Sequence, residues 1–83
     1  MRGYIVINGY LQLKDLPMQV SQLQAAGKVF GLELIAIRHD ELCMDFDGLQ
    51  NKLRQENIVF AIYYDKDLYL ALLMEKCGIR LFN

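Results

Sequence analysis

The feature that most constrains the fold is the alternation of short β-branched segments with longer segments of helical periodicity. Strands are expected at residues 4–7, 32–37, 58–64 and 79–82, since each is rich in apolar strand-forming residues and adjoins a Gly or Asn. The third run, IVFAIYY, is almost continuously apolar, as in a strand covered on both faces. Such alternation predicts a small Rossmann-like α/β domain of three layers, a parallel sheet with helices on both faces. Because crossovers are right-handed, a four-stranded sheet of order 2-1-3-4 is the simplest topology.

Helix start and stop signals fall between these strands. Asp15 is a candidate N-cap for the first helix, with Pro17 in its first turn. Gly31 and Gly78 are placed to end the first and third helices in a left-handed conformation. Residues at three- and four-residue spacing are expected on one face of the first helix: Val20, Leu23, Ala26, Gly27 and Phe30.

The sequence signals for a helix are weaker in the second helical segment than in the third. Leu49 and Leu53 indicate a short second helix, and Asn57 is a possible end signal. Asp65 is expected to cap the third helix, over residues 66–76.

Composition limits the class of protein. Eighty-three residues are enough for one domain, residues 1–83, and too few for two. Nine basic and ten acidic side chains give no basic footprint, so no nucleic-acid partner is expected. The longest apolar run, Leu68–Met74, is far shorter than the ~20 residues of a membrane span, and the N-terminus has no signal-peptide core. We therefore expect a cytoplasmic protein whose thiols, Cys43 and Cys77, are reduced.

The predicted topology also locates a candidate ligand site. Open α/β sheets bind ligands beyond the carboxyl ends of the strands, where the strand order reverses. Asn8 and Asp65 follow the first and third strands and are the candidate substrate-binding residues. His39 and Asn83 follow the second and fourth strands and are possible flanks of the same cleft. A turn role for Asn8 and a capping role for Asp65 are the alternatives.

Motifs for catalysis or metal binding are incomplete. The loop after the first strand lacks the glycine spacing of a phosphate cradle. Residues 39–48, HDELCMDFDG, fail as a calcium loop, since Arg54 falls where a bidentate Glu is required. His39 and Cys43 form at best half a zinc site, and His39 has no identifiable nucleophile partner. The sequence therefore assigns no catalytic residue, no metal ligands and no cofactor to this chain.

The third helix is more apolar than packing requires. A helix on one face of a small sheet needs a single apolar stripe, whereas residues 68–74 are uncharged on nearly every side. The surplus predicts a contact with a second copy or with another domain. The expected interface residues are Leu68, Tyr69, Leu72 and Leu73.

Three segments carry a family resemblance. MRGYIVINGYL at the start, HDEL in the middle and YYDKDLYLALLMEKCGIRLFN at the end resemble the N-terminal segment of RimK-like glutamate ligases of the ATP-grasp superfamily. The likeness spans essentially the whole chain, although residues 12–38 match only in pattern. The closing motif is the most specific part.

The resemblance implies a pre-ATP-grasp domain, a fragment of a longer ATP-dependent carboxylate–amine ligase. It implies that ATP and magnesium bind to downstream domains, so this chain alone is not catalytic. Asn8 and Asp65 match motif residues near the substrate cleft, and Asn83 matches the residue that leads into the next segment. The expected role is to form one wall of the acceptor-substrate cleft and to dock against the downstream ATP-grasp domains.

Two alternatives from other classes stay open. One is a self-standing interaction domain that homodimerises through the third helix or through the open edge of the last strand. The other is a small nucleotide-binding regulator.

Overall fold

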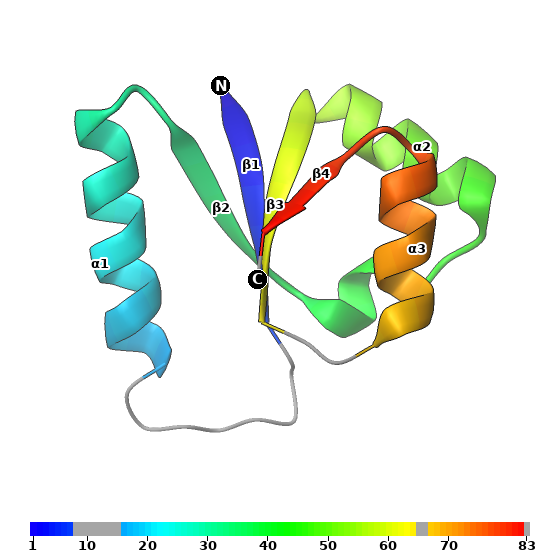
Figure 1. Ribbon diagram of the computed structural model, residues 1–83, viewed down its shortest axis with the longest axis horizontal. Helices are drawn as coiled ribbons and strands as arrows, with labels where there is room; N and C mark the ends of the chain where they lie inside the picture. The colour runs from blue at the N-terminus through cyan, green and yellow to red at the C-terminus, as the bar shows by residue number, and fades with distance from the viewer. Residues whose placement is uncertain (8–15, 65–66, 83) are drawn as a thin grey trace.

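The computed structural model describes residues 1–7, 16–64 and 67–82, with the backbone alone for residues 16, 17 and 64 (Figure 1). It contains a four-stranded sheet in the order β2-β1-β3-β4, in which all neighbours are parallel. The predicted α/β class and strand order are therefore confirmed. The strands are β1 (Arg2–Ile7), β2 (Glu33–Arg38), β3 (Ile58–Tyr64) and β4 (Arg80–Phe82).

Helices cover both faces of the sheet, as predicted. Helix α1 (Leu16–Val29) lies on one face, while α2 (Phe46–Gln55) and α3 (Leu68–Lys76) lie on the other (Figure 1). A short 3₁₀ helix, η1 (His39–Leu42), directly follows β2. None of the helices in the described part of the chain is long and apolar enough to cross a bilayer.

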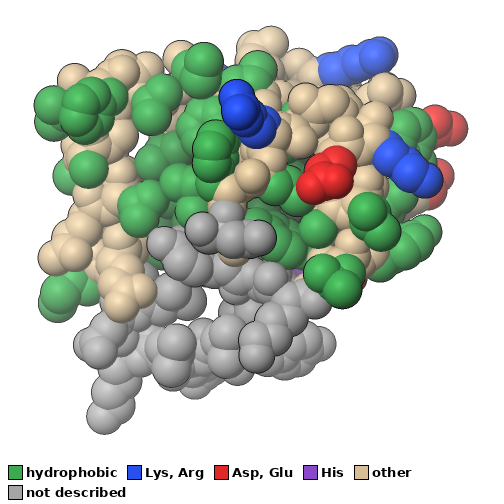
Figure 2. Space-filling view, viewed as in Figure 1, with side chains coloured by type: hydrophobic (Ala, Val, Ile, Leu, Met, Phe, Trp, Pro, Cys, Tyr) green, Lys and Arg blue, Asp and Glu red, His purple; other side chains and the backbone are tan. Residues whose placement is uncertain are grey.

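The core is divided unequally by the sheet. A larger cluster fills the space between the sheet and the pair α2 and α3, and a smaller one lies beneath α1. Apolar side chains remain visible between α1 and the front edge of the sheet, and over α3 (Figure 2). The smaller cluster contains Ile5, Val20, Leu34 and Phe60.

The expected helix ends are largely confirmed. Gly31 and Gly78 have φ values of 74° and 85°, the left-handed conformation that ends a helix without a Cβ clash. Asn57, the signal predicted after the second helix, has a φ of 58°. Leu49 and Leu53 are both buried in the larger cluster, as their spacing predicted.

The expected apolar face of α1 is only partly correct. Val20 and Gly27 are buried and Leu23 is half-buried, but Ala26 and Phe30 are exposed. Phe30 lies beyond the last residue of the helix, in the turn that leads to β2, so helical periodicity no longer places it against the sheet.

The prediction that the third strand is covered on both faces is wrong at Val59, which is exposed. Consecutive residues of β1, Arg2 and Gly3, pair with Ile58 and Phe60, so Val59 has no partner in the register. It occupies a β-bulge, which turns its side chain away from the regular alternation of the strand.

The start of α3 also differs from the prediction. The helix begins at Leu68, and its N-cap is Asp67 instead of Asp65. The Asp67 carboxylate accepts hydrogen bonds from the backbone N–H groups of Tyr69 and Leu70, at 2.9 and 3.1 Å. In this position Asp67 also pairs with His39 of η1. This is a tertiary contact, which the periodicity of the sequence cannot predict. Asp65 and the predicted first-helix cap Asp15 lie outside the described residues.

Candidate functional site

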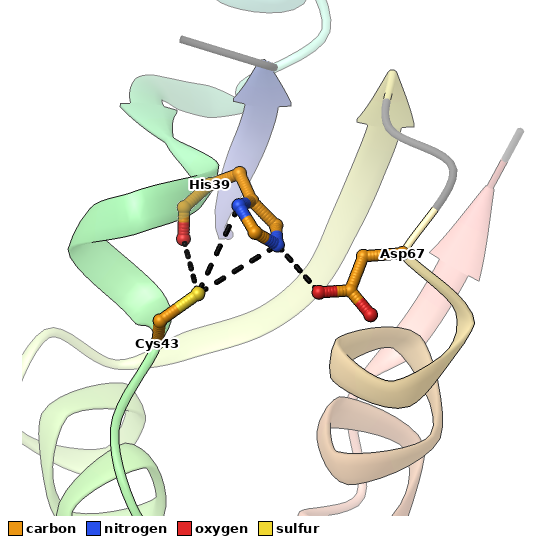
Figure 3. Close-up of side chains that lie close together, drawn as sticks. All are labelled: His39, Cys43 and Asp67. Carbon is orange, nitrogen blue, oxygen red and sulfur yellow. Dashed lines mark hydrogen bonds and ion pairs between the residues drawn. The ribbon is translucent and has the colours of Figure 1, made fainter.

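Three chemically reactive side chains meet at the carboxyl end of the sheet (Figure 3). His39 begins η1 directly after β2, Cys43 follows η1, and Asp67 precedes α3 after β3. Because β1 lies between β2 and β3, these groups meet across the carboxyl end of the central strand. This is the topological switch point at which open α/β sheets bind ligands.

The His39 ring contacts both of the other side chains. Its Nε2 lies 2.6 Å from Oδ2 of Asp67, a residue 28 positions away in the sequence. The Cys43 sulfur lies 3.6 Å from Nε2 and 3.8 Å from Nδ1, nearly equidistant from the two ring nitrogens. The Cys43 thiol also donates to the backbone oxygen of His39 at 3.5 Å. One donor atom of each of the three residues lies within 4.8 Å of the others.

The Asp67 carboxylate has a different task at each oxygen. Oδ1 caps α3, and Oδ2 faces His39. The hydrogen bond with His39 lowers the pKa of Asp67, with help from the backbone N–H groups of Leu70 and Tyr69, while burial opposes them. The backbone is fixed as well, since the Tyr63 hydroxyl donates to the Asp67 carbonyl at 2.7 Å. Asp67 is thus an oriented carboxylate that stays ionised at neutral pH.

The HDEL segment owes its shape to local contacts. The backbone N–H of Arg38 donates to the Glu41 carboxylate at 2.9 Å, and the Arg38 guanidinium contacts both carboxylate oxygens of Asp40 at 3.1 and 3.0 Å. Leu42 is fully buried in the larger core cluster and anchors the turn. The acidic side chains of η1 therefore hold its shape, and His39 is left to face Asp67.

An apolar pocket of about 220 Å³ lies beside this group. Its wall is formed by the segment after η1 and by the first turns of α3, with the Cys43 thiol and the Asp67 carboxylate as its polar elements. Such a combination, mostly apolar with few convergent polar groups, is typical of small-ligand sites. The lining residues are Leu42, Cys43, Met44, Asp67, Tyr69, Leu70 and Leu73.

The predicted site residues fare unequally. His39, predicted as a flank of the cleft, lies at the carboxyl end of the sheet and takes part in the group of three. Asn8, Asp65 and Asn83 lie outside the described residues, so their binding roles stay predictions.

The predicted interface residues on α3 lie on two sides of the helix. Leu68, Tyr69 and Leu72 are 76%, 71% and 57% exposed, whereas Leu73 is half-buried. Tyr69 and Leu73, one turn apart, both line the pocket. The surplus of apolar surface on α3 is thus present, and its role as an interface stays a prediction.

Sequence reasoning missed the part that Asp67 plays. By sequence His39 and Cys43 form at best half a zinc site, and no second pair of ligands completes it. The available signal is that His39 follows β2 and Asp67 follows β3, two strands that both lie next to β1 in the sheet. Polar residues after parallel strands converge even when far apart in sequence.

Comparison of the chain with protein-family models, with curated proteins and with solved structures gave no match. The resemblance to RimK-like ligases therefore rests on the sequence motifs, and the candidate site rests on the geometry given above.

Proposed function

We propose that the chain is the N-terminal, substrate-side and docking domain of an ATP-dependent carboxylate–amine ligase of the RimK-like, glutamate-type class. Support comes from the three motif segments and from the fold, because the resemblance implies a Rossmann-like domain and the sheet is parallel with the order 2-1-3-4. In this role ATP and magnesium are bound by other domains of the same protein, so this chain binds and positions without catalysing.

The pocket beside Asp67 is the observation that carries the proposal. It opens at the carboxyl edge of the sheet and combines an apolar wall with an ionised carboxylate. An amino-acid substrate presents the complementary groups, an ammonium for the carboxylate and an aliphatic stem for the apolar wall. Asn8 and Asp65 keep their predicted substrate-binding role as further polar groups of the same cleft.

The exposed side of α3 supports the docking role. Leu68 and Leu72 are large apolar side chains one turn apart on the helix, and both are exposed. Tyr69 beside them is exposed as well and also lines the pocket. Contacts between domains of one chain resemble moderately polar protein–protein interfaces, in which a few apolar anchors contribute most of the energy. This face would pack against the catalytic domains and hold the pocket beside the acceptor substrate.

The test uses the protein encoded by the whole gene. We expect ADP formation that requires both a carboxylate substrate such as glutamate and an amine acceptor. A Leu68→Asp/Leu72→Asp variant is expected to lose about tenfold or more of this activity, since each change would place an unpaired carboxylate in an apolar contact. Met18→Asp, a matched change of an exposed apolar residue on α1, is the control and should have little effect.

Two results would contradict the proposal: a whole-gene product without substrate-dependent ATP turnover, or an α3 double variant as active as the Met18→Asp control. Retained fold must be checked for each variant by circular dichroism, so that a loss of activity reports docking.

A second candidate is a homodimerising interaction domain. The observation that favours it is the edge strand β4, which among the described strands pairs only with β3 and lies next to the apolar face of α3. An open edge offers backbone groups to a second copy. Light scattering on the 83-residue chain separates the two functions, because a strict monomer at high concentration removes this candidate.

A further inference from the structure

We propose that His39, Cys43 and Asp67 form a binding site for a transition-metal dication, with Zn²⁺ as the best-matched ion. The proposal goes beyond the ligase role and uses the Asp67 carboxylate differently, since a bound ion would compete with a substrate ammonium for this group. It rests on the meeting of an imidazole, a thiol and a carboxylate whose donor atoms lie within 4.8 Å of one another.

The donor set selects the metal. Imidazole nitrogen and thiolate sulfur are ligands of zinc and related borderline ions, whereas magnesium and calcium prefer oxygen donors alone. One carboxylate oxygen completes a His-Cys-Asp set, which has the three protein ligands of an open zinc site. Such sites keep a fourth position for water or for a ligand.

Two of the three donor distances are close to those of a zinc site, and Cys43 must move toward Asp67, since these two donor atoms are only within 4.8 Å of one another. Zinc bonds of ~2.0–2.3 Å arranged tetrahedrally place donor atoms roughly 3.3–3.6 Å apart. The Cys43 sulfur already lies 3.6 Å from Nε2 of His39. Nε2 and Oδ2 of Asp67 are 2.6 Å apart because they share a hydrogen bond, and a metal would replace the shared proton and open this distance by under ~1 Å.

The surroundings hold the carboxylate in place. Oδ1 of Asp67 is bound by two backbone N–H groups, which leaves Oδ2 directed at His39. The Tyr63 hydroxyl fixes the backbone of the same residue. Outer hydrogen bonds of this kind orient metal ligands and raise affinity.

The position of the site also leaves room for exchange. The side chains of His39 and Asp67 are 20% and 33% exposed, and Cys43 is exposed, so an ion can enter from solvent. Cys43 and Asp67 line the 220 Å³ pocket, so a bound ion would lie beside it. Binding releases the thiol proton, and His39 binds the ion through Nε2 as a neutral ring with its proton on Nδ1.

The experiment is a titration of the reduced 83-residue chain with Co²⁺, followed by displacement with Zn²⁺. We expect a sulfur-to-cobalt charge-transfer band and visible bands of four-coordinate intensity, both removed by Zn²⁺. Cys43→Ser should abolish the charge-transfer band and weaken binding by about a hundredfold, at the upper end of losses already seen for outer-shell changes. Asp67→Asn keeps the helix cap, and it should weaken binding without removing the charge-transfer band.

Two variants serve as matched controls. Cys77→Ser removes the other thiol, at the end of α3, and Asp40→Asn removes a carboxylate of η1 that pairs with Arg38. Both should bind Co²⁺ as the unmodified chain does. The proposal is overturned if the unmodified chain shows no charge-transfer band, or if Cys77→Ser loses the band as fully as Cys43→Ser.

Discussion

The hydroxyl of Tyr4 donates a hydrogen bond to Oε2 of Glu56, and so joins the middle of β1 to the residue that follows α2, 52 positions along the chain. Nζ of Lys52 lies 3.0 Å from the same carboxylate oxygen, and the Arg2 guanidinium donates to the Glu56 carbonyl at 2.6 Å. Burial raises the pKa of Tyr4 above its usual range, with further help from Glu56, so the hydroxyl stays protonated. This polar group fixes α2 to the sheet at the end opposite the candidate site.

Replacing Tyr4 by Phe removes the hydrogen bond and keeps the buried ring. Glu56 retains Lys52 as a partner. The expected loss is about 1.5–3 kcal/mol in the free energy of unfolding, the range for hydrogen bonds to charged groups. Urea unfolding measures it. Tyr69→Phe is the matched control, since Tyr69 is exposed, and its unfolding midpoint should not change. Equal midpoints for the two variants would contradict the structural role of Tyr4.

The same hydrogen bond predicts an acid dependence of stability. Contact with Tyr4 is the main cause that lowers the pKa of Glu56, and Lys52 adds to it. Because the pKa of Glu56 is lower in the folded chain than in the unfolded chain, the ionised carboxylate stabilises the fold. This contribution is complete above the unfolded-state pKa of ~4.3 and is lost as the pH falls through the folded-state pKa. The stability gap between wild type and Tyr4→Phe should therefore be constant near neutrality and narrow below about pH 4.

The acid loss due to Asp67, whose pKa is also lowered, occurs in both chains and cancels in this comparison. Urea unfolding at several pH values gives the gap. A gap that is constant, or that widens, down to the lowest pH would show that Glu56 does not accept this hydrogen bond.

Two substitutions separate the two roles of Asp67, which are to cap α3 and to pair with His39. Asp67→Ala removes the side chain that caps α3 and should cost about 1 kcal/mol or more, because an Ala at the N-cap leaves backbone N–H groups unpaired. Asp67→Asn keeps a capping oxygen and loses the charge that faces His39. We expect it to be the milder change in thermal or urea unfolding. Asp45→Ala, which removes the N-cap of α2, is the matched control and should resemble Asp67→Ala.

Two leucines of α3 test which side of the helix faces the core. Leu70 is 2% exposed and belongs to the larger cluster, whereas Leu72 is largely exposed. Leu70→Ala should destabilise the chain by about 2–5 kcal/mol through lost burial and a cavity. Leu72→Ala should change stability by under ~0.5 kcal/mol. The stability of both variants is measured on the monomeric chain. If Leu72→Ala loses as much unfolding free energy as Leu70→Ala, the orientation of α3 against the core described above is wrong.

The order and pairing of the strands could be predicted because they depend on patterns that persist along the sequence. Glycines at 31 and 78 mark the helix ends, and the handedness of crossovers leaves few topologies. The β-bulge at Val59 could not be predicted from the sequence, because it depends on how β3 pairs with β1 and not on the composition of either strand.

The location of the candidate site can be predicted from the sequence, but the set of residues that form it cannot. His39 was expected at the carboxyl edge, which follows from parallel strands. Its partner Asp67 depends on where α3 begins, and both Asp65 and Asp67 are good capping residues by sequence. The contact with His39, 28 positions away, is a tertiary preference that local patterns do not contain.

The DNA that follows the codon for Asn83 shows whether this chain is the front domain of a ligase. We expect an open frame for about 200 further residues, a normal length for additional domains, whose product forms ADP only with a carboxylate and an amine present. A stop codon immediately after Asn83 would rule out the ligase role and favour the homodimerising interaction domain.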